Sequence, residues 1–200
     1  LLLPPGPGPH PAWVALHGHG DTPEVFRDHY GGRLLQARGF VVLIPELRGI
    51  CIDADEDRDA RAMLAAGASM AGVRVYEAWL ARQYLASRRD VLPRRIGVMG
   101  HSIGGLLAIL VVRMDRGFAA LATDNSGTWL DWTSGEDDWM ADSMAPSLVP
   151  YRDLINNIGN GLDLPAWEAQ YTFAGRDEPE ADPEMIDRIA ALLPLGRGAP

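Results

Sequence analysis

The sequence is poor in cysteine, in basic residues relative to acidic ones, and in long apolar runs. Its single cysteine, Cys51, cannot form an internal disulfide, so nothing in the fold requires an oxidising compartment and we expect a cytoplasmic protein. Lysine and arginine number 18 against 27 aspartates and glutamates, a formal charge of −9, which argues against a nucleic-acid partner because no basic surface remains to bind phosphates. The longest apolar run, Leu106–Val112, is far shorter than the roughly 20 residues of a membrane-spanning helix, and we expect no membrane partner.

What is present fits one domain over residues 1–200, because 47% of the residues are hydrophobic and can form a sizeable core. Short apolar segments predict five strands, at Ala12–Leu16, Phe40–Ile44, Arg95–Met99, Phe118–Thr123 and Tyr171–Ala174. Helical patterns between and after them cover Glu24–Arg38, Met70–Ala86, Gly104–Met114 and Pro183–Leu193. This alternation predicts an α/β fold in which a mostly parallel sheet carries helices on both faces.

Two segments interrupt the alternation. Residues 124–165, from Asp124 to Pro165, are rich in Asp, Gly, Asn and Trp and longer than an ordinary connection, which favours a cap or lid over a site. The acidic run Asp53–Asp59 is typical of a solvated loop leading into a helix near Arg58. It lacks the glycine and the spacing of a calcium loop, so we expect no metal there.

The pentapeptide Gly100–His101–Ser102–Ile103–Gly104 matches G-x-S-x-G and lies between a predicted strand and a predicted buried helix. That context is typical of a nucleophile elbow, a strained turn whose small flanking residues let the strand and the helix approach closely. The bare pattern also occurs by chance in a chain of this composition. The position of the pattern therefore carries the prediction that Ser102 is a nucleophile.

A serine nucleophile needs donors for the oxyanion that forms on the substrate. The backbone N–H of Ile103 lies at the expected helix N-terminus, where unpaired donors favour an anion. We expect the second donor in the loop His17–Gly20, which follows the first strand directly, with the N–H of His19 preferred and that of Gly20 as the alternative. The loop could instead be a simple turn with locally bonded histidines. A metal site at His17 and His19 lacks further ligands, so no metal is expected.

The serine also needs a base oriented by a carboxylate. Asp177 follows the last predicted strand and is our candidate, with Asp124 as the runner-up and a plain surface turn as the alternative reading. In α/β-hydrolases the chain order is Ser, then Asp or Glu, then His, yet no histidine follows Asp177. The five histidines are His10, His17, His19, His29 and His101. We read His101 as packing against or shaping the pocket, and expect the catalytic histidine in a segment beyond Pro200.

The chain resembles the dienelactone-hydrolase and acetyl-xylan-esterase-like branch of the α/β-hydrolases. The resemblance runs from about Pro11 to Leu193 and is carried by His17–Gly20, by Tyr84–Arg88, by Arg95–Gly105 and by Gly175–Asp177. It implies further strands at both ends in complete members, attack of Ser102 on an ester carbonyl, support of a base by Asp177, and no cofactor. The missing histidine is the departure from the family pattern.

The expected substrate is a small-molecule carboxylic ester, and peptidase, thioesterase or lactonase chemistry would use the same acyl-enzyme cycle. Trp129 and Trp132, with Trp139, are candidates for an apolar or sugar-stacking pocket beside His101, or else form the core of a lid. The competing class is a catalytically inactive protein that keeps this fold for binding, an alternative that the missing base favours.

Overall fold

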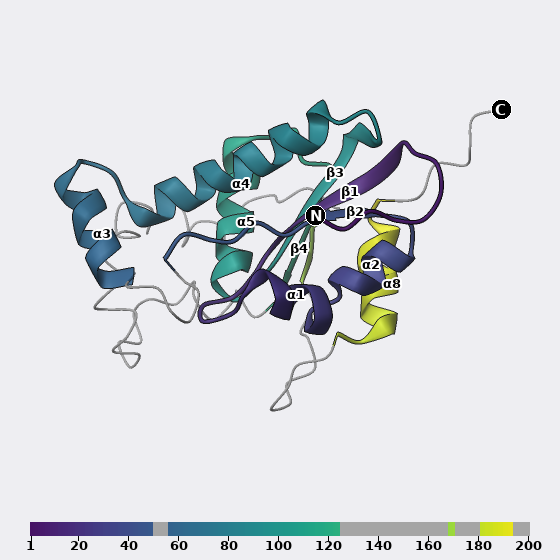
Figure 1. The fold of residues 1–200 in the computed structure, drawn as a ribbon, viewed down its shortest axis with the longest axis horizontal. Helices are drawn as coiled ribbons and strands as arrows, with labels where there is room; N and C mark the ends of the chain where they lie inside the picture. The colour runs from purple at the N-terminus through teal and green to yellow at the C-terminus, as the bar shows by residue number, and fades with distance from the viewer. Residues whose placement is uncertain (50–55, 125–167, 171–180, 194–200) are drawn as a thin grey trace.

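The computed structural model describes residues 1–49, 56–124, 168–170 and 181–193 (Figure 1). In chain order the elements are β1 (His10–Leu16), α1 (Pro23–His29), α2 (Gly32–Ala37), β2 (Val41–Leu43), α3 (Glu56–Ala65), α4 (Met70–Ser87), β3 (Val91–His101), α5 (Ile103–Met114), β4 (Ala120–Asp124), β5 (Glu168–Gln170) and α8 (Pro183–Ala191).

The strands form one sheet in the order β2-β1-β3-β4-β5, and every neighbouring pair is parallel. This confirms the predicted fold class. The chain leaves β1 toward β2 and then returns to build β3, β4 and β5 on the other side. The carboxyl ends of β1 and β3 therefore lie side by side, with Leu16 opposite Gly100. In open parallel sheets, the crevice at such a reversal is where ligands bind.

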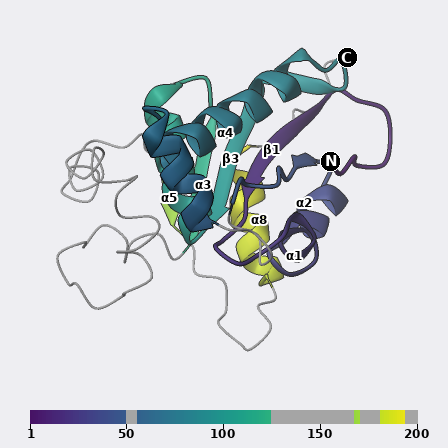
Figure 2. The same cartoon turned by 60° about the vertical axis from the view of Figure 1, so that its left-hand side comes forward.

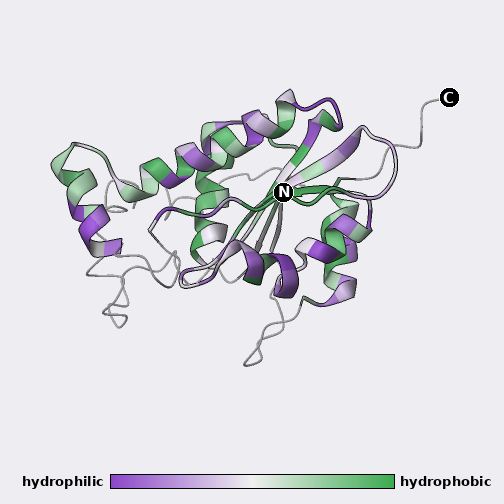
Figure 3. Ribbon diagram, viewed as in Figure 1, coloured by the Kyte–Doolittle hydropathy of each residue, from purple (hydrophilic) through white to green (hydrophobic). Residues whose placement is uncertain are grey.

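Helices cover both faces of the sheet (Figures 1 and 2), with α4 and α5 on one face and α1, α2 and α8 on the other. Strand β1 serves both layers because successive side chains point to opposite faces. Val14 and Leu16 join the core with α4 and α5, whereas Trp13 joins the opposite core, and all three are fully buried. Helix α5 is hydrophobic along much of its length (Figure 3), and every residue from Ile103 to Val112 is buried.

The single helix predicted over residues 24–38 is wrong, because the structure has two helices, α1 and α2. Gly31 separates them in a left-handed conformation with φ 93°, which favours glycine. A Cβ at Gly31 would lie 2.3 Å from Cδ1 of Ile186 in α8. The pair Gly31–Gly32 is a local sign of a turn, and contact with a helix 155 positions later in the chain leaves no room for a side chain at Gly31.

The strand predicted at residues 171–174 lies outside the described residues. The described fifth strand is β5, just before that range. The helix expected to begin near Arg58 is α3, which begins at Glu56. Glu56 is only 8% exposed, so the prediction of a solvated loop is wrong for this residue. In the described parts of the chain no helix is both long and apolar enough to cross a bilayer.

Candidate active site

Ser102 occupies the turn between β3 and α5 with φ 52° and ψ −120°. Among the described residues it is the only one other than glycine with a positive φ. Such backbone costs a serine about 1–3 kcal/mol and persists only when its surroundings impose it. Ser102 is also the N-cap residue of α5, yet its side chain makes no capping hydrogen bond. The hydroxyl therefore does not accept a hydrogen bond from the first N–H groups of α5, as the hydroxyl of an N-cap serine ordinarily does.

The two glycines of the pentapeptide impose this turn by close backbone packing. A Cβ at Gly100 would lie 2.2 Å from the carbonyl oxygen of Gly104, so β3 and α5 meet with no room for a side chain. A Cβ at Gly104 would lie 2.1 Å from the carbonyl oxygen of Leu16, at the end of β1. The start of α5 is thus pressed against both strands, which fixes the position of Ser102 at the carboxyl edge of the sheet.

The loop His17–Gly20 leaves β1 at the same edge. Its turn is closed by the Asp21 N–H, which donates to the Gly18 carbonyl at 3.3 Å, and by the Gly18 N–H, which donates to the Asp21 carboxylate at 3.2 Å. Gly20 has φ 78°. Since Leu16 lies opposite Gly100, the residues that follow each strand, including His19 and Ser102, lie on the same side of the molecule.

His17 ties this loop to the sheet. Its ring is fully buried, and Nε2 accepts the Leu47 N–H at 3.1 Å. Nδ1 therefore carries the proton and donates to the Gly18 carbonyl at 3.0 Å. Burial lowers the pKa of His17 below its ordinary value, so the ring is held neutral. Both nitrogens are engaged, which leaves neither open to a metal.

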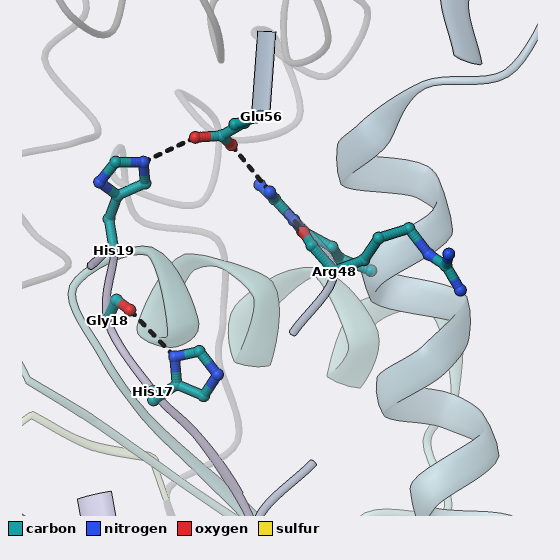
Figure 4. A network of polar contacts seen from close by, with 6 residues as sticks. His17, Gly18, His19, Arg48 and Glu56 are labelled. Atoms are coloured by element: carbon teal, nitrogen blue, oxygen red, sulfur yellow. Dashed lines mark hydrogen bonds and ion pairs between the residues drawn. The ribbon is translucent and has the colours of Figure 1, made fainter. Parts of the chain in front are cut away.

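His19 binds a carboxylate. Its Nε2 lies 2.6 Å from Oε2 of Glu56, and the two side chains point toward one another in Figure 4. The other oxygen, Oε1, accepts from Nη2 of the buried Arg74 at 2.8 Å. Among the described residues no three His, Cys, Asp or Glu side chains gather as metal ligands.

His101 lies beside the loop and not in an open position. Its ring stacks on Tyr30 at a centroid distance of 4.4 Å. A Cβ at Gly18 would lie 2.7 Å from Cδ2 of His101, so the imidazole edge is packed directly against that glycine. The ring thereby links α1, the first loop and the turn at Ser102.

Of the remaining predicted site residues, the structure describes Asp124 alone. Asp177, Trp129, Trp132 and Trp139 lie outside the described residues, as does most of the predicted lid. Asp124 ends β4, and its backbone lies opposite His101 in the parallel pairing of β3 and β4.

Sequence reasoning named His17 only as a loop residue that could bond locally, and it missed Glu56. The buried role of His17 had a signal, since a histidine directly after a buried strand is placed to accept a hydrogen bond from the neighbouring chain. Glu56 had none, because it stood in an acidic run and its partner His19 is 37 residues away.

Comparison with known proteins agrees with this architecture. A family model described as "Alpha/beta hydrolase family" matches residues 13–200. The chain belongs to the α/β-hydrolase family. It is 43% identical over 53 residues to "Putative hydrolase YtaP" of Bacillus subtilis (strain 168), a match over 26% of this chain and 18% of that protein.

Two solved structures share the fold at low identity. One is a glucuronoyl esterase from Solibacter usitatus, with a TM-score of 0.54 and 13% identity, which covers 93% of this chain and 61% of that one. The other is a "putative acetyl xylan esterase" from Bacteroides fragilis NCTC 9343, with a TM-score of 0.51 and 18% identity over 59% of this chain. The matched part spans 38% of that second structure, so this chain corresponds to only part of each relative's length.

Proposed function

We propose that this chain carries the nucleophile of a serine hydrolase that cleaves carboxylic esters through an acyl-enzyme, with Ser102 as the attacking residue. The observation that carries the proposal is the strained backbone of Ser102 together with a hydroxyl that does not cap α5. Glycine would satisfy this turn without strain. A serine kept at such a position is best explained by chemistry at its hydroxyl, and the turn is then a nucleophile elbow.

The reaction begins when Oγ of Ser102 attacks the ester carbonyl carbon. A carbon–oxygen bond forms, the hydroxyl proton passes to a base, and the carbonyl π electrons move onto the oxygen to give an oxyanion. Collapse of this intermediate expels the alcohol, which takes up the proton, and water then cleaves the acyl-enzyme by the same steps. No cofactor takes part.

Two main-chain donors are proposed for the oxyanion hole. Ile103 is the first residue of α5, and the first N–H groups of a helix have no partner within it. The N–H of His19 is the second donor, because its loop follows the strand that lies beside β3. Each such donor typically contributes about 100- to 1000-fold to turnover.

The base is proposed to be a histidine outside these 200 residues, oriented by Asp177. Three of the five histidines are otherwise engaged: His17 uses both ring nitrogens, His19 binds Glu56, and His101 stacks on Tyr30. His10 begins β1, at the end of the sheet opposite Ser102. Asp124 remains the alternative carboxylate, since its backbone lies opposite His101.

The proposed substrate is a small or medium-sized ester. The esterase names of the structural neighbours support this class, and His101, Trp129 and Trp132 are the candidates for its pocket. Thioesters, lactones and peptides would follow the same cycle, and the pocket decides among them.

Hydrolysis of p-nitrophenyl acetate tests this proposal in the protein as its gene encodes it. A covalent acyl-enzyme predicts a rapid burst of p-nitrophenolate equal to the number of active sites, followed by a slower steady rate. Ser102→Ala should abolish both phases. Ser69→Ala is the matched control, because Ser69 also caps a helix and its hydroxyl accepts the Gly72 N–H at 3.1 Å. Hydrolysis that survives Ser102→Ala would refute the proposal.

A further inference from the structure

Glu56 is a buried carboxylate that the proposed reaction does not use directly. It is the first residue of α3 and comes from a different part of the chain than the loop it contacts. One oxygen lies 2.6 Å from Nε2 of His19, and the other accepts from Nη2 of Arg74 at 2.8 Å. The carboxylate thus bridges the loop after β1 and the helix α4.

Arg74 gives this bridge a fixed anchor. Its side chain is fully buried in α4, and its Nε donates to the Arg48 carbonyl at 2.7 Å. Burial lowers the pKa of Arg74, and the charge of Glu56 partly offsets that shift. Burial alone would raise the pKa of Glu56, but the His19 hydrogen bond and the Arg74 charge outweigh it and hold that pKa below its ordinary value. The contact is therefore made by an ionised carboxylate.

The loop His17–Gly20 is consequently held from two sides. On the sheet side the buried His17 binds the Leu47 N–H and the Gly18 carbonyl. On the outer side the ring of His19, which is 37% exposed, is held by Glu56. A residue whose main-chain N–H must meet a transient oxyanion needs such support, because catalytic groups displaced by about 1 Å lose much of their effect.

We propose that Glu56 is a positioning residue. By binding the side chain of His19 and forming an ion pair with Arg74, it fixes the main-chain N–H of His19 for the oxyanion. This role rests on the proposed function of Ser102 and deepens it. It assigns no proton transfer to Glu56 and none to the His19 ring. The ring serves only as the group through which the Glu56 carboxylate binds the loop.

A double-mutant cycle on p-nitrophenyl acetate hydrolysis tests the role in the protein as its gene encodes it. His19→Ala keeps the main-chain donor but removes the imidazole that Glu56 binds. Glu56→Gln removes the negative charge that binds this imidazole. Each is expected to lower kcat by about 10- to 100-fold with little change in KM. Because both act through one contact, the double variant should be no slower than the slower single one. Effects that multiply would overturn the proposal.

Rescue by a conservative variant separates positioning from chemistry at the ring. The amide of His19→Gln can still donate to Glu56, so this variant should keep most of kcat. A ring that acted as a base would not be rescued in this way, and loss of activity in His19→Gln equal to that in His19→Ala would refute the role. Neither His19 variant touches the Glu56–Arg74 pair, so the test stands even where Glu56→Gln fails to fold.

Asp90→Asn is the control for charge removal. Asp90 binds Arg88 at 2.6 Å in an ion pair just before β3, at the end of that strand opposite Ser102, and kcat should be unchanged. The two proposals fail in different ways. Absence of hydrolysis that depends on Ser102 in the wild-type protein would remove the proposed function. Wild-type kcat in Glu56→Gln, with Ser102 still required, would remove only the role of Glu56.

Discussion

Replacing Ser102 by glycine is expected to give a more stable protein than replacing it by alanine. Both changes remove the hydroxyl, so the difference between them isolates the backbone. At φ 52° and ψ −120° a residue with a Cβ is strained by about 1–3 kcal/mol. Glycine adopts this conformation freely but costs about 0.5–1 kcal/mol of backbone entropy.

The balance leaves Ser102→Gly about 1 kcal/mol more stable than Ser102→Ala. In a domain of this size that difference raises the melting temperature by about 2–4 °C. Thermal unfolding followed by circular dichroism measures it directly. Ala62→Gly, at an exposed helical position of α3, is the control and should shift stability in the opposite direction by about 1 kcal/mol. If Ser102→Ala melts at or above the temperature of Ser102→Gly, the strain argument is refuted.

Three further predictions concern Gly104, His17 and the ion pair of Arg74 with Glu56. Gly104→Ala places a methyl group 2.1 Å from the Leu16 carbonyl oxygen, so urea unfolding should show a loss of about 2–3 kcal/mol; a wild-type midpoint would contradict the packing described. Burial lowers the pKa of His17, so the folded protein favours the neutral ring. The stability of the wild-type protein should therefore fall as the pH drops below about 6.5, the ordinary pKa of histidine. His17→Gln should flatten that dependence between about pH 7 and 5, and parallel pH profiles would rule the assignment out. Arg74→Met leaves Glu56 buried without its ion-pair partner and should cost about 3–5 kcal/mol; addition of Glu56→Gln should restore part of that loss, and an additive double variant would speak against the pair.

The sequence predicts the parts of this molecule that depend on local pattern. The buried strands β1 and β4 appear as short apolar runs, and α5 appears as an apolar helix after a glycine. The pentapeptide at Ser102 is found because both glycines and the serine lie within five consecutive residues. The sequence therefore identifies Ser102 as the candidate nucleophile, which stays a prediction, and the structure adds the contact of Gly104 with Leu16 of β1.

Contacts between distant segments are not predictable in this way. The contact of Gly31 with Ile186 lies outside any window around residues 24–38, although the pair Gly31–Gly32 within that window is a turn signal. Glu56 stands among surface-type acidic residues, and its burial is tolerable only because Arg74 of α4 and His19 of the first loop meet it in space. Local polarity therefore wrongly predicts that Glu56 is exposed to solvent, because the fold buries it beside an ion-pair partner.

Covalent labelling with a fluorophosphonate tests directly whether Ser102 is an activated nucleophile. The label is applied to the protein as its gene encodes it, and the modified peptide is identified by mass mapping. The phosphonyl group reacts with an activated serine and stays on its Oγ. We expect one modified peptide, the one that contains Ser102, and no label in Ser102→Ala. An unlabelled wild-type protein, or a label that persists in Ser102→Ala, would contradict this expectation.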